Sequence, residues 1–244
     1  MSNQPGIINV LKPPGMTSFD VVGYIKKVLQ IKKAGHTGTL DPAAAGVLPV
    51  CLHRGTKIIP YLPEEKKVYI ARIRLGLKTD TLDADGEILE KDNNWQSLDD
   101  NQIKEAVQSF SGEVMQKPPI YSAVKVNGKR LYHYARNDQE AKVEIKDRVV
   151  NIYDIEVLNI NLPLIKIKVS CSKGTYIRSL ARDIGSKLNT FAHLKNLLRT
   201  ASGPFKLEDT VTLYEITNEN LDNILISLDS PFDYRTMEVK DYAY

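Results

Sequence analysis

A single aspartate, Asp41, lies in a loop whose neighbours are mostly glycine, alanine and threonine. The segment reads GHTGTLDPAAAGVLP over residues 35–49, so small side chains allow another chain to approach the carboxylate closely. A carboxylate in this setting can act as a nucleophile or can abstract a proton. An Asp-Pro pair also opens many ordinary turns, so the loop alone leaves a purely structural role open.

Other catalytic and ligand-binding patterns are missing from the sequence. It has no GxxxxGK[ST] phosphate loop, no GxGxxG and no GxSxG turn. The four histidines are scattered without the spacing of metal ligands. The run DTLDADG at 80–86 hints at a calcium loop, but Thr81 stands where the first ligand should be and Asp92 replaces the closing glutamate. That run is typical of an acidic β-turn, and we expect no metal and no cofactor.

The elements that must position Asp41 mix strands and helices without the regular β–α alternation of a parallel sheet. Thr17 and Asp20 form a plausible capping pair for a helix that runs to about Leu29. Strands are expected at 7–11, 47–52, 69–75, 143–158 and 164–171, and helices at 99–110, 172–188 and near 212–225. The pattern predicts an α+β fold around a mixed, mostly antiparallel sheet.

The composition is that of an ordinary soluble globular protein. The 244 residues are 42% hydrophobic and 26% charged. No window approaches the apolar length of a membrane span, and the first residues lack the pattern of a secretion signal. Two cysteines, Cys51 and Cys171, do not support a disulfide framework, so we expect a cytoplasmic protein.

Charge is distributed very unevenly along the chain, although its net value is only +3. Residues 1–57 hold seven Lys/Arg and two Asp/Glu, residues 117–136 hold five and none, and residues 166–206 hold nine and one. If these three basic blocks share a face, they attract a polyanion such as nucleic acid. The alternative is that each block is only a solvated surface.

The loop around Asp41 resembles the G-H-x-G-x-L-D-P-x-A-x-G-V-L-P signature of the TruB family, the tRNA pseudouridine-55 synthases. Four further family blocks follow the same order. They are K-P-x-G-x-T-S at 12–18, Y-x(5)-L-G-x-x-T-D-T-x-D-A-D-G at 69–86, P-P-x-Y-S-A-x-K at 118–125 and S-K-G-T-Y-I-R at 172–178. The resemblance covers about residues 7–205. It implies the pseudouridine synthase fold, with a mixed, mostly antiparallel central sheet flanked by helices and loops.

The resemblance implies a role for each matched residue. Asp41 falls on the catalytic aspartate, Tyr69 on the tyrosine that stacks on the target base, and Arg178 on the arginine that pairs with the aspartate. His36 falls on the histidine that fills the space left by the flipped nucleotide. An arginine beside a carboxylate keeps it ionised and oriented, and an aromatic ring holds a base by stacking.

Further residues of these blocks are expected to contact RNA. The insertion at about 117–142 is expected to close over the bound RNA. The family block that contains Lys12 is expected to have a mainly structural role. Near Arg199 the family often has two adjacent arginines, and Leu198 replaces the first, which puts one contact in question. The expected RNA contacts beside His36 are Lys12, Lys125, Lys129, Arg130, Lys173, Tyr176 and Arg199.

The expected domains are a catalytic domain at 1–206 and a short acidic extension at 207–244, without a complete PUA-type RNA-binding domain. The implied activity is isomerisation of uridine 55 in the T-arm of tRNA, by base flipping and aspartate catalysis. The chain is expected to act alone, as a monomer, with no protein partner and no membrane. Two alternatives stay open: a guide-RNA-dependent pseudouridine synthase, and an RNA-binding tRNA-folding chaperone.

Overall fold

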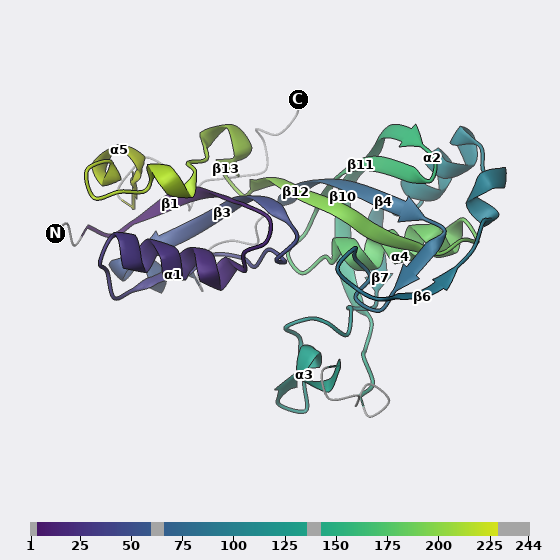
Figure 1. Ribbon diagram of the computed structural model, residues 1–244, viewed down its shortest axis with the longest axis horizontal. Coiled ribbons are helices and arrows are strands. Elements are labelled where there is room, and N and C mark those ends of the chain that lie inside the picture. The colour runs from purple at the N-terminus through teal and green to yellow at the C-terminus, as the bar shows by residue number, and fades with distance from the viewer. Residues whose placement is uncertain (1–3, 60–65, 136–142, 229–244) are drawn as a thin grey trace. The chain divides into compact units, whose positions relative to one another are not determined.

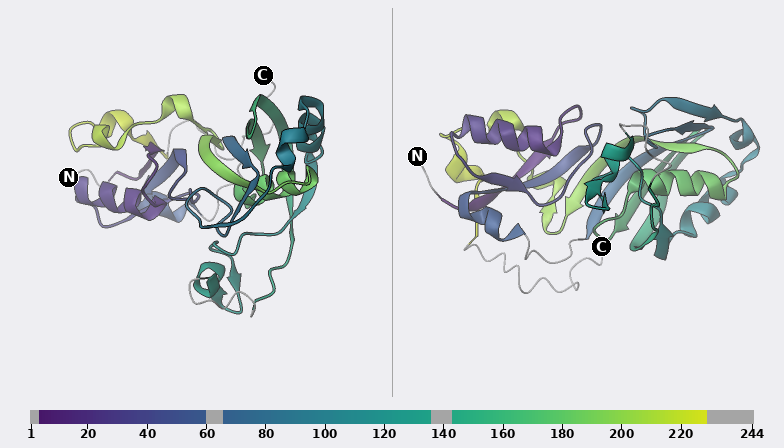
Figure 2. Two further views of the ribbon diagram at one scale, coloured as in Figure 1. Left: turned by 45° about the vertical axis from the view of Figure 1, so that its right-hand side comes forward. Right: turned by 90° about the horizontal axis from the view of Figure 1, so that it is seen from below.

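A computed structural model of the chain describes residues 4–59, 66–135 and 143–228 and contains two compact units (Figures 1 and 2). The first unit combines residues 1–65 with residues 199–244, and the second comprises residues 66–198. Strand β12 (Ala192–Ser202) runs through the boundary and contributes residues to both units.

The sheet of the first unit has the strand order β14-β1-β3-β12. Strands β1 (Gly6–Lys12) and β3 (Ala45–Leu52) are antiparallel, with Gly6 opposite Leu52 and Lys12 opposite Gly46. Short strands extend this sheet, because β2 pairs with β3, β13 with β12 and β14 with β1. The remaining elements here are β2 (Ala34–His36), η1 (His53–Lys57), β13 (Phe205–Lys206), η5 (Leu207–Asp209) and β14 (Ile226–Ser227).

Helix α1 (Ser18–Val28) covers one face of this sheet and confirms the predicted capping pair. The Thr17 side chain accepts from the backbone of Asp20, and the Asp20 carboxylate accepts from the backbone of Thr17. Alternation along β1 sends Ile8 into the cluster that contains Val21, Val22, Ile25 and Leu29 of the helix region. Ile7 faces the other way and packs with Val47, Cys51 and Phe205.

The described part of the C-terminal segment belongs to the first unit, so the compact units do not divide at residue 206. Val211 exchanges backbone hydrogen bonds with the region of β1, and Ile216 and Leu221 are buried in the core over α1. The helix expected near 212–225 is wrong. A 3-10 turn η6 (Leu213–Glu215) and a four-residue α5 (Leu221–Ile224) replace it. Ile216 and Leu221 stand five residues apart, a spacing that one straight helix would not place on one face. Residues 229–244 lie outside the described residues.

The sheet of the second unit has the order β12-β4-β11-β10-β7. Strands β4 (Lys67–Leu75) and β11 (Leu164–Cys171) are antiparallel, as are β11 with β10 (Arg148–Asn161) and β10 with β7 (Gly112–Gln116). The strand predicted at 164–171 is present with the predicted bounds, and those predicted at 69–75 and 143–158 are present with shifted ends. Strands β7 and β12 were not predicted. The α+β class with a mostly antiparallel sheet is confirmed.

Two helices pack on this sheet, α2 (Asp100–Gln108) against β10 and α4 (Ile177–Lys187) against β4. Helix α2 has a capping box at Asp99 and matches the prediction closely. Helix α4 begins five residues later than expected. Ser172 and Thr175 form a side-chain-bonded turn before it, because the Thr175 hydroxyl donates to the Ser172 carbonyl. The other elements of the unit outside the insertion are β5 (Leu77–Thr79), β6 (Ile88–Lys91) and η3 (Asn94–Ser97).

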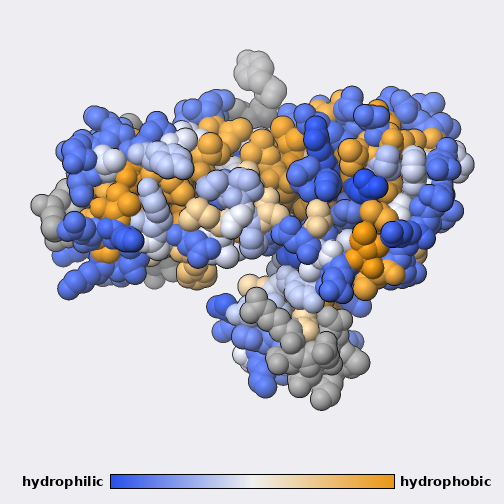
Figure 3. Space-filling view, in the orientation of Figure 1, coloured by the Kyte–Doolittle hydropathy of each residue, from blue (hydrophilic) through white to orange (hydrophobic). Residues whose placement is uncertain are grey.

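The predicted insertion after Lys117 stands away from the sheet of the second unit, in the segment that carries α3 (Leu131–Ala135) (Figure 1). A small hairpin of β8 (Lys125–Val126) and β9 (Lys129–Arg130) precedes the helix. Leu131 and Ala135 are buried within this segment, and hydrophilic residues cover much of its visible surface (Figure 3). Residues 136–142 of the insertion lie outside the described residues.

Within the described ranges, no helix is both long and apolar enough to cross a membrane. Cys51 and Cys171 are buried free thiols, and burial raises the pKa of Cys171 to about 11. A thiol of this kind is a small apolar core residue at neutral pH.

Candidate active site

The backbone around Asp41 is fixed from α1. The Ser18 hydroxyl donates to the Leu40 carbonyl at a distance of 3.1 Å and accepts from the Leu40 amide at a distance of 2.9 Å. Directly after this bonded residue, the Asp41 carbonyl accepts from the Ala44 amide over 3.0 Å and closes a turn. One serine therefore satisfies both backbone groups of the residue that precedes the carboxylate.

Lys12 holds the other side of the same turn. Its ammonium donates to the carbonyls of Pro13 at 2.8 Å, Pro42 at 3.1 Å and Ala44 at 2.6 Å, and its side chain is completely buried. Burial lowers the pKa of Lys12 to about 8, a shift that the Asp41 carboxylate opposes and the Arg199 guanidinium assists. Lys12 thus remains mostly charged at neutral pH, close to Asp41.

Arg199 performs a similar task for the residues that precede and follow the turn. Its guanidinium donates to the carbonyls of Val47 at 2.7 Å, Gly38 at 3.1 Å and Thr39 at 3.3 Å, and the side chain is fully buried. Gly46 allows this approach. Its φ is +114°, and a Cβ there would lie 2.2 Å from the Arg199 carbonyl oxygen.

The expectation that Lys12 and Arg199 contact RNA is corrected by these contacts. Both side chains have an exposed fraction of zero and donate hydrogen bonds to backbone carbonyls of the Asp41 loop. A buried cation bonded in this way cannot also bind a phosphate at the surface. Their role here is to shape the loop and to add positive charge near the carboxylate.

His36, at the end of β2, is half-buried and lies opposite Val50 in the sheet. The Phe19 ring meets the imidazole edge-on, with ring centroids 5.4 Å apart and planes at 80°. Phe19 itself is 72% exposed, which is unusual for a phenylalanine on a helix that otherwise buries its apolar positions. An exposed aromatic ring beside His36 adds a flat apolar surface to this end of the first unit.

Tyr69 lies in the second unit, on the inward-facing side of β4. It is 6% exposed, stands opposite Val169 of β11 and shares the buried face of β4 with Ala71 and Ile73. The ring position is therefore fixed by a central strand. That placement is compatible with a stacking platform and with an ordinary core residue.

Arg178 is in the first turn of α4 and is 6% exposed. Its guanidinium donates to the Thr81 carbonyl and to the Tyr121 carbonyl, each at a distance of 3.0 Å, and lies 3.5 Å from the Asp83 carboxylate. Three segments far apart in sequence therefore converge on one arginine: the acidic turn, the insertion and the helix. Because a planar guanidinium donates in fixed directions, these contacts set its orientation.

The remaining predicted RNA contacts lie in the second unit and differ from Lys12 and Arg199 in exposure. Lys125, Lys129 and Arg130 in the insertion are exposed, and Lys173 is exposed in the turn before α4. Tyr176 is half-buried directly before that helix. These side chains are placed where a phosphate backbone could reach them, and their RNA contacts stay predictions.

The structure thus assembles the predicted residues in two groups. In the first unit, Lys12 and Arg199 surround the loop of Asp41, and His36 lies in the same segment. In the second unit, Arg178 donates hydrogen bonds both to the acidic turn and to the insertion. Among the described residues, no group of three or more His, Cys, Asp and Glu side chains could hold a metal ion.

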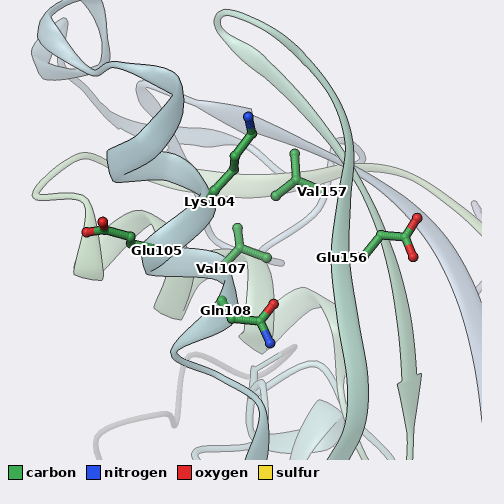
Figure 4. A pocket seen from close by; sticks show the side chains of 6 residues that line it. All are labelled: Lys104, Glu105, Val107, Gln108, Glu156 and Val157. Atoms are coloured by element: carbon green, nitrogen blue, oxygen red, sulfur yellow. The ribbon is translucent and has the colours of Figure 1, made fainter.

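A pocket of about 400 Å³ between α2 and β10 includes none of the predicted site residues (Figure 4). Val107 and Val157 face its interior, whereas the carboxylates of Glu105 and Glu156 point away from it. The pocket therefore carries no convergent set of reactive groups.

Sequence reasoning missed three residues of this site. Asp83 lies in the family block at 69–86, whose acidic run predicts a turn and gives no role to this carboxylate. Ser18 also stood in a matched block and was not singled out. Gln116, which bonds the residue before α4, gave no sequence signal, because an isolated glutamine predicts neither chemistry nor burial.

Comparison with known families identifies the class to which the chain belongs. Residues 26–177 match the TruB family pseudouridylate synthase (N terminal domain), and residues 178–232 match the tRNA pseudouridylate synthase B C-terminal domain. Together with the α+β fold, these matches define the class of the protein as a pseudouridylate synthase, an isomerase. The chain belongs to the TruB family of these enzymes, as its sequence blocks predict.

Individual relatives are similar over nearly the whole chain. A tRNA pseudouridine synthase B of Clostridium tetani is 48% identical over 97% of this chain and 81% of that protein. Its counterpart in Clostridium novyi is 51% identical over 92% of this chain and 76% of that protein. A chain in a crystal structure of a Cbf5-Nop10-Gar1 complex is 36% identical with a TM-score of 0.69. The alignment covers 91% of this chain and 56% of that one, so this chain spans just over half of its length.

Proposed function

We propose that this chain isomerises uridine 55, in the T-loop of tRNA, to pseudouridine. Its membership of the TruB family and its high identity to proteins named tRNA pseudouridine synthase B support this substrate. The reaction breaks the bond between N1 of uracil and C1′ of ribose, turns the base, and joins C5 to C1′. N1 gains a proton and C5 loses one, so substrate and product are isomers and no co-substrate is consumed.

Asp41 is the proposed catalytic carboxylate. The observation that carries this assignment is the fixation of its backbone on both sides, by Ser18 before it and by Lys12 after it. A carboxylate can attack C6 of the base, attack C1′ of the sugar, or abstract a sugar proton, and each of these steps needs a carboxylate held in place. The buried charges of Lys12 and Arg199 provide a preorganised positive environment for it.

Tyr69 and Arg178 are proposed to act on the same uridine. The match to the family blocks supports a stacking role for the Tyr69 ring and an ion pair between Arg178 and the carboxylate. The fixed orientation of the Arg178 guanidinium supports that role, because an arginine that is already bonded loses little entropy on meeting its partner. His36 is proposed to occupy the gap that the flipped nucleotide leaves in the RNA loop.

The T-arm stem-loop is the proposed recognition element. Exposed cations in the insertion and before α4 would contact its phosphates, and such contacts make affinity depend on salt. The chain is proposed to act as a monomer in the cytoplasm and to need no guide RNA, since its identity to tRNA-type relatives exceeds its identity to the Cbf5 chain.

A turnover assay tests this proposal. Purified protein is incubated with unmodified tRNA transcript, without cofactor or guide, and pseudouridine is mapped by sequence position. We expect modification at position 55, and loss of turnover by several orders of magnitude in Asp41→Asn with retained tRNA binding. Asp222→Asn, which removes an exposed carboxylate of α5 in the same unit, is the matched control and should remain active.

The same assay separates the alternatives. Binding and annealing of tRNA without any turnover would favour a folding chaperone. Turnover that appears only after addition of a guide RNA would favour a guide-dependent enzyme. Either result in the wild-type protein would contradict the proposed function.

A further inference from the structure

Gln116, the last residue of β7, makes an unusual pair of hydrogen bonds with the backbone of Tyr176. Its side-chain amide donates to the Tyr176 carbonyl over 3.1 Å, and its side-chain oxygen accepts from the Tyr176 amide over 2.8 Å. The glutamine is 2% exposed. A side chain thus pairs with a main-chain residue through both groups, as a strand neighbour would, in a buried position.

Tyr176 stands directly before α4 and has no side-chain cap of its own. The first backbone amides of a helix lack partners within the helix and need another acceptor when they are buried. Gln116 supplies an acceptor for one such group from a different element. The start of α4 is therefore defined by β7 and not by a local capping residue.

The residues that follow Gln116 continue this connection into the insertion. The Lys117 carbonyl accepts from the Ser179 hydroxyl over 2.7 Å, and the Tyr121 carbonyl accepts from Arg178 over 3.0 Å. Four hydrogen bonds thus join the segment from Gln116 to Tyr121, where the insertion starts, to the beginning of α4. Movement of one would displace the other, including the guanidinium of Arg178.

We propose that Gln116 is a positioning residue that couples the start of the insertion to Arg178. Binding of the insertion to RNA then sets the orientation of the Arg178 guanidinium. This inference rests on the proposed function. Gln116 touches neither the reacting atoms nor the arginine side chain in the described contacts, and it acts through the Tyr176 backbone. Loss of its two bonds leaves the Tyr176 amide without that acceptor. The Tyr176 carbonyl keeps its bond from the Leu180 amide but loses its second donor, and the turn that carries Arg178 is less firmly held.

Gln116→Met tests the proposal, because methionine keeps nearly the same volume and removes both bonds. We expect kcat on tRNA to fall about 10–100-fold, as misplacement of a catalytic group by a fraction of an ångström to 1 Å can do, while KM changes less than about threefold. Gln108→Met, at the exposed end of α2 in the same unit, is the matched control and should leave both constants unchanged. Gln116→Glu keeps the acceptor for the Tyr176 amide and should lose less kcat than Gln116→Met.

A double-mutant cycle decides whether the effect passes through Arg178. Gln116→Met should cost little further kcat in an Arg178→Lys background, because the guanidinium that it positions is already gone. Additive losses would overturn the coupling, as would a rise in KM with unchanged kcat or an unchanged single variant. A variant that does not fold is replaced by Gln116→Glu in the same cycle. If the wild-type protein makes no pseudouridine, the proposed function fails and this inference fails with it; an active wild type with additive losses overturns this inference alone.

Discussion

The close approach of Gly46 to the backbone of Arg199 predicts a large cost for the smallest possible substitution. In Gly46→Ala, the added Cβ would lie 2.2 Å from the Arg199 carbonyl oxygen and 2.8 Å from its nitrogen. Neither atom belongs to a flexible side chain, so two backbone segments would have to separate by about 1.2 Å to reach an ordinary contact of 3.4 Å. These segments hold the loop of Asp41, so the strain falls on the proposed catalytic residue.

The magnitude follows from three contributions. A φ of +114° disfavours any residue with a Cβ, by roughly 1–2 kcal/mol. Separation of packed backbone adds about 1–3 kcal/mol for overpacking, and weakened hydrogen bonds of Arg199 add about 1 kcal/mol more. The total of about 3–6 kcal/mol corresponds to a decrease in Tm of roughly 9–18 °C for a chain of this size, at about 3 °C per kcal/mol.

Gly15→Ala is the matched control in the same unit. Gly15 also has a positive φ, +86°, but a Cβ there meets nothing within 4 Å. It should therefore show the conformational cost alone, a decrease in Tm of about 3–6 °C. Thermal unfolding followed by circular dichroism, with kcat measured at 25 °C, compares the two variants. Equal melting temperatures, or full activity of Gly46→Ala, would refute the reasoning that this contact shapes the Asp41 loop.

Three further outcomes are expected. The pKa of Lys12 is about 8 in the folded chain and 10.5 when unfolded, so the unfolded chain binds more protons between these two values and the stability contributed by this group rises with pH there. In urea unfolding, the free energy of unfolding of the wild type should therefore rise by about 1–2 kcal/mol more than that of Lys12→Met between pH 7.5 and 9.5. An equal rise in both proteins would contradict the assigned shift. Asp83→Asn should lower kcat about 10–100-fold with little change in KM, because it removes a charge 3.5 Å from Arg178; a change confined to KM would argue against an orienting role. Lys129→Ala combined with Arg130→Ala should raise the Kd for tRNA and flatten its dependence on salt while kcat at saturation is kept, and an unchanged salt slope would show that these exposed cations do not contact phosphates.

Local patterns were sufficient where local physics decides the structure. The Thr17 and Asp20 pair predicts the start of α1, and the structure contains both hydrogen bonds of that capping box. The alternation from Tyr69 to Leu75 predicts β4, whose buried face alternates as expected. Both features depend on contacts within a few residues, which a sequence displays directly.

Prediction failed where distant contacts decide the structure. Strand β12 was missed because its burial does not alternate along its length, so its sequence lacks the period of two that marks a strand. Strand β7 is short, lies at the sheet edge and exposes 61% of Met115, so it lacks a clear apolar face. In the C-terminal segment, Ile216 and Leu221 are drawn into the core of the first unit, and this tertiary burial overrides local helix propensity.

The same limit explains the error on Lys12 and Arg199. A sequence shows a cation but not the carbonyls that could accept its donors, so a cation in a basic block is expected to reach a phosphate. Five of the six such bonds from these two side chains end on residues 38–47 around Asp41. Four of these acceptors lie in the irregular stretch between β2 and β3, which does not satisfy its own carbonyls through strand pairing.

A neutral donor could satisfy some of those carbonyls without the cost of burying a charge. Two buried cations therefore need a reason beyond loop folding, and the nearby carboxylate of Asp41 provides one. A glycine- and alanine-rich loop lets RNA approach but has few side chains with which to define its own shape or field. Lys12 and Arg199 supply both through their bonds to the loop carbonyls, and residues 38–44 carry no charged side chain besides Asp41, the proposed catalytic residue.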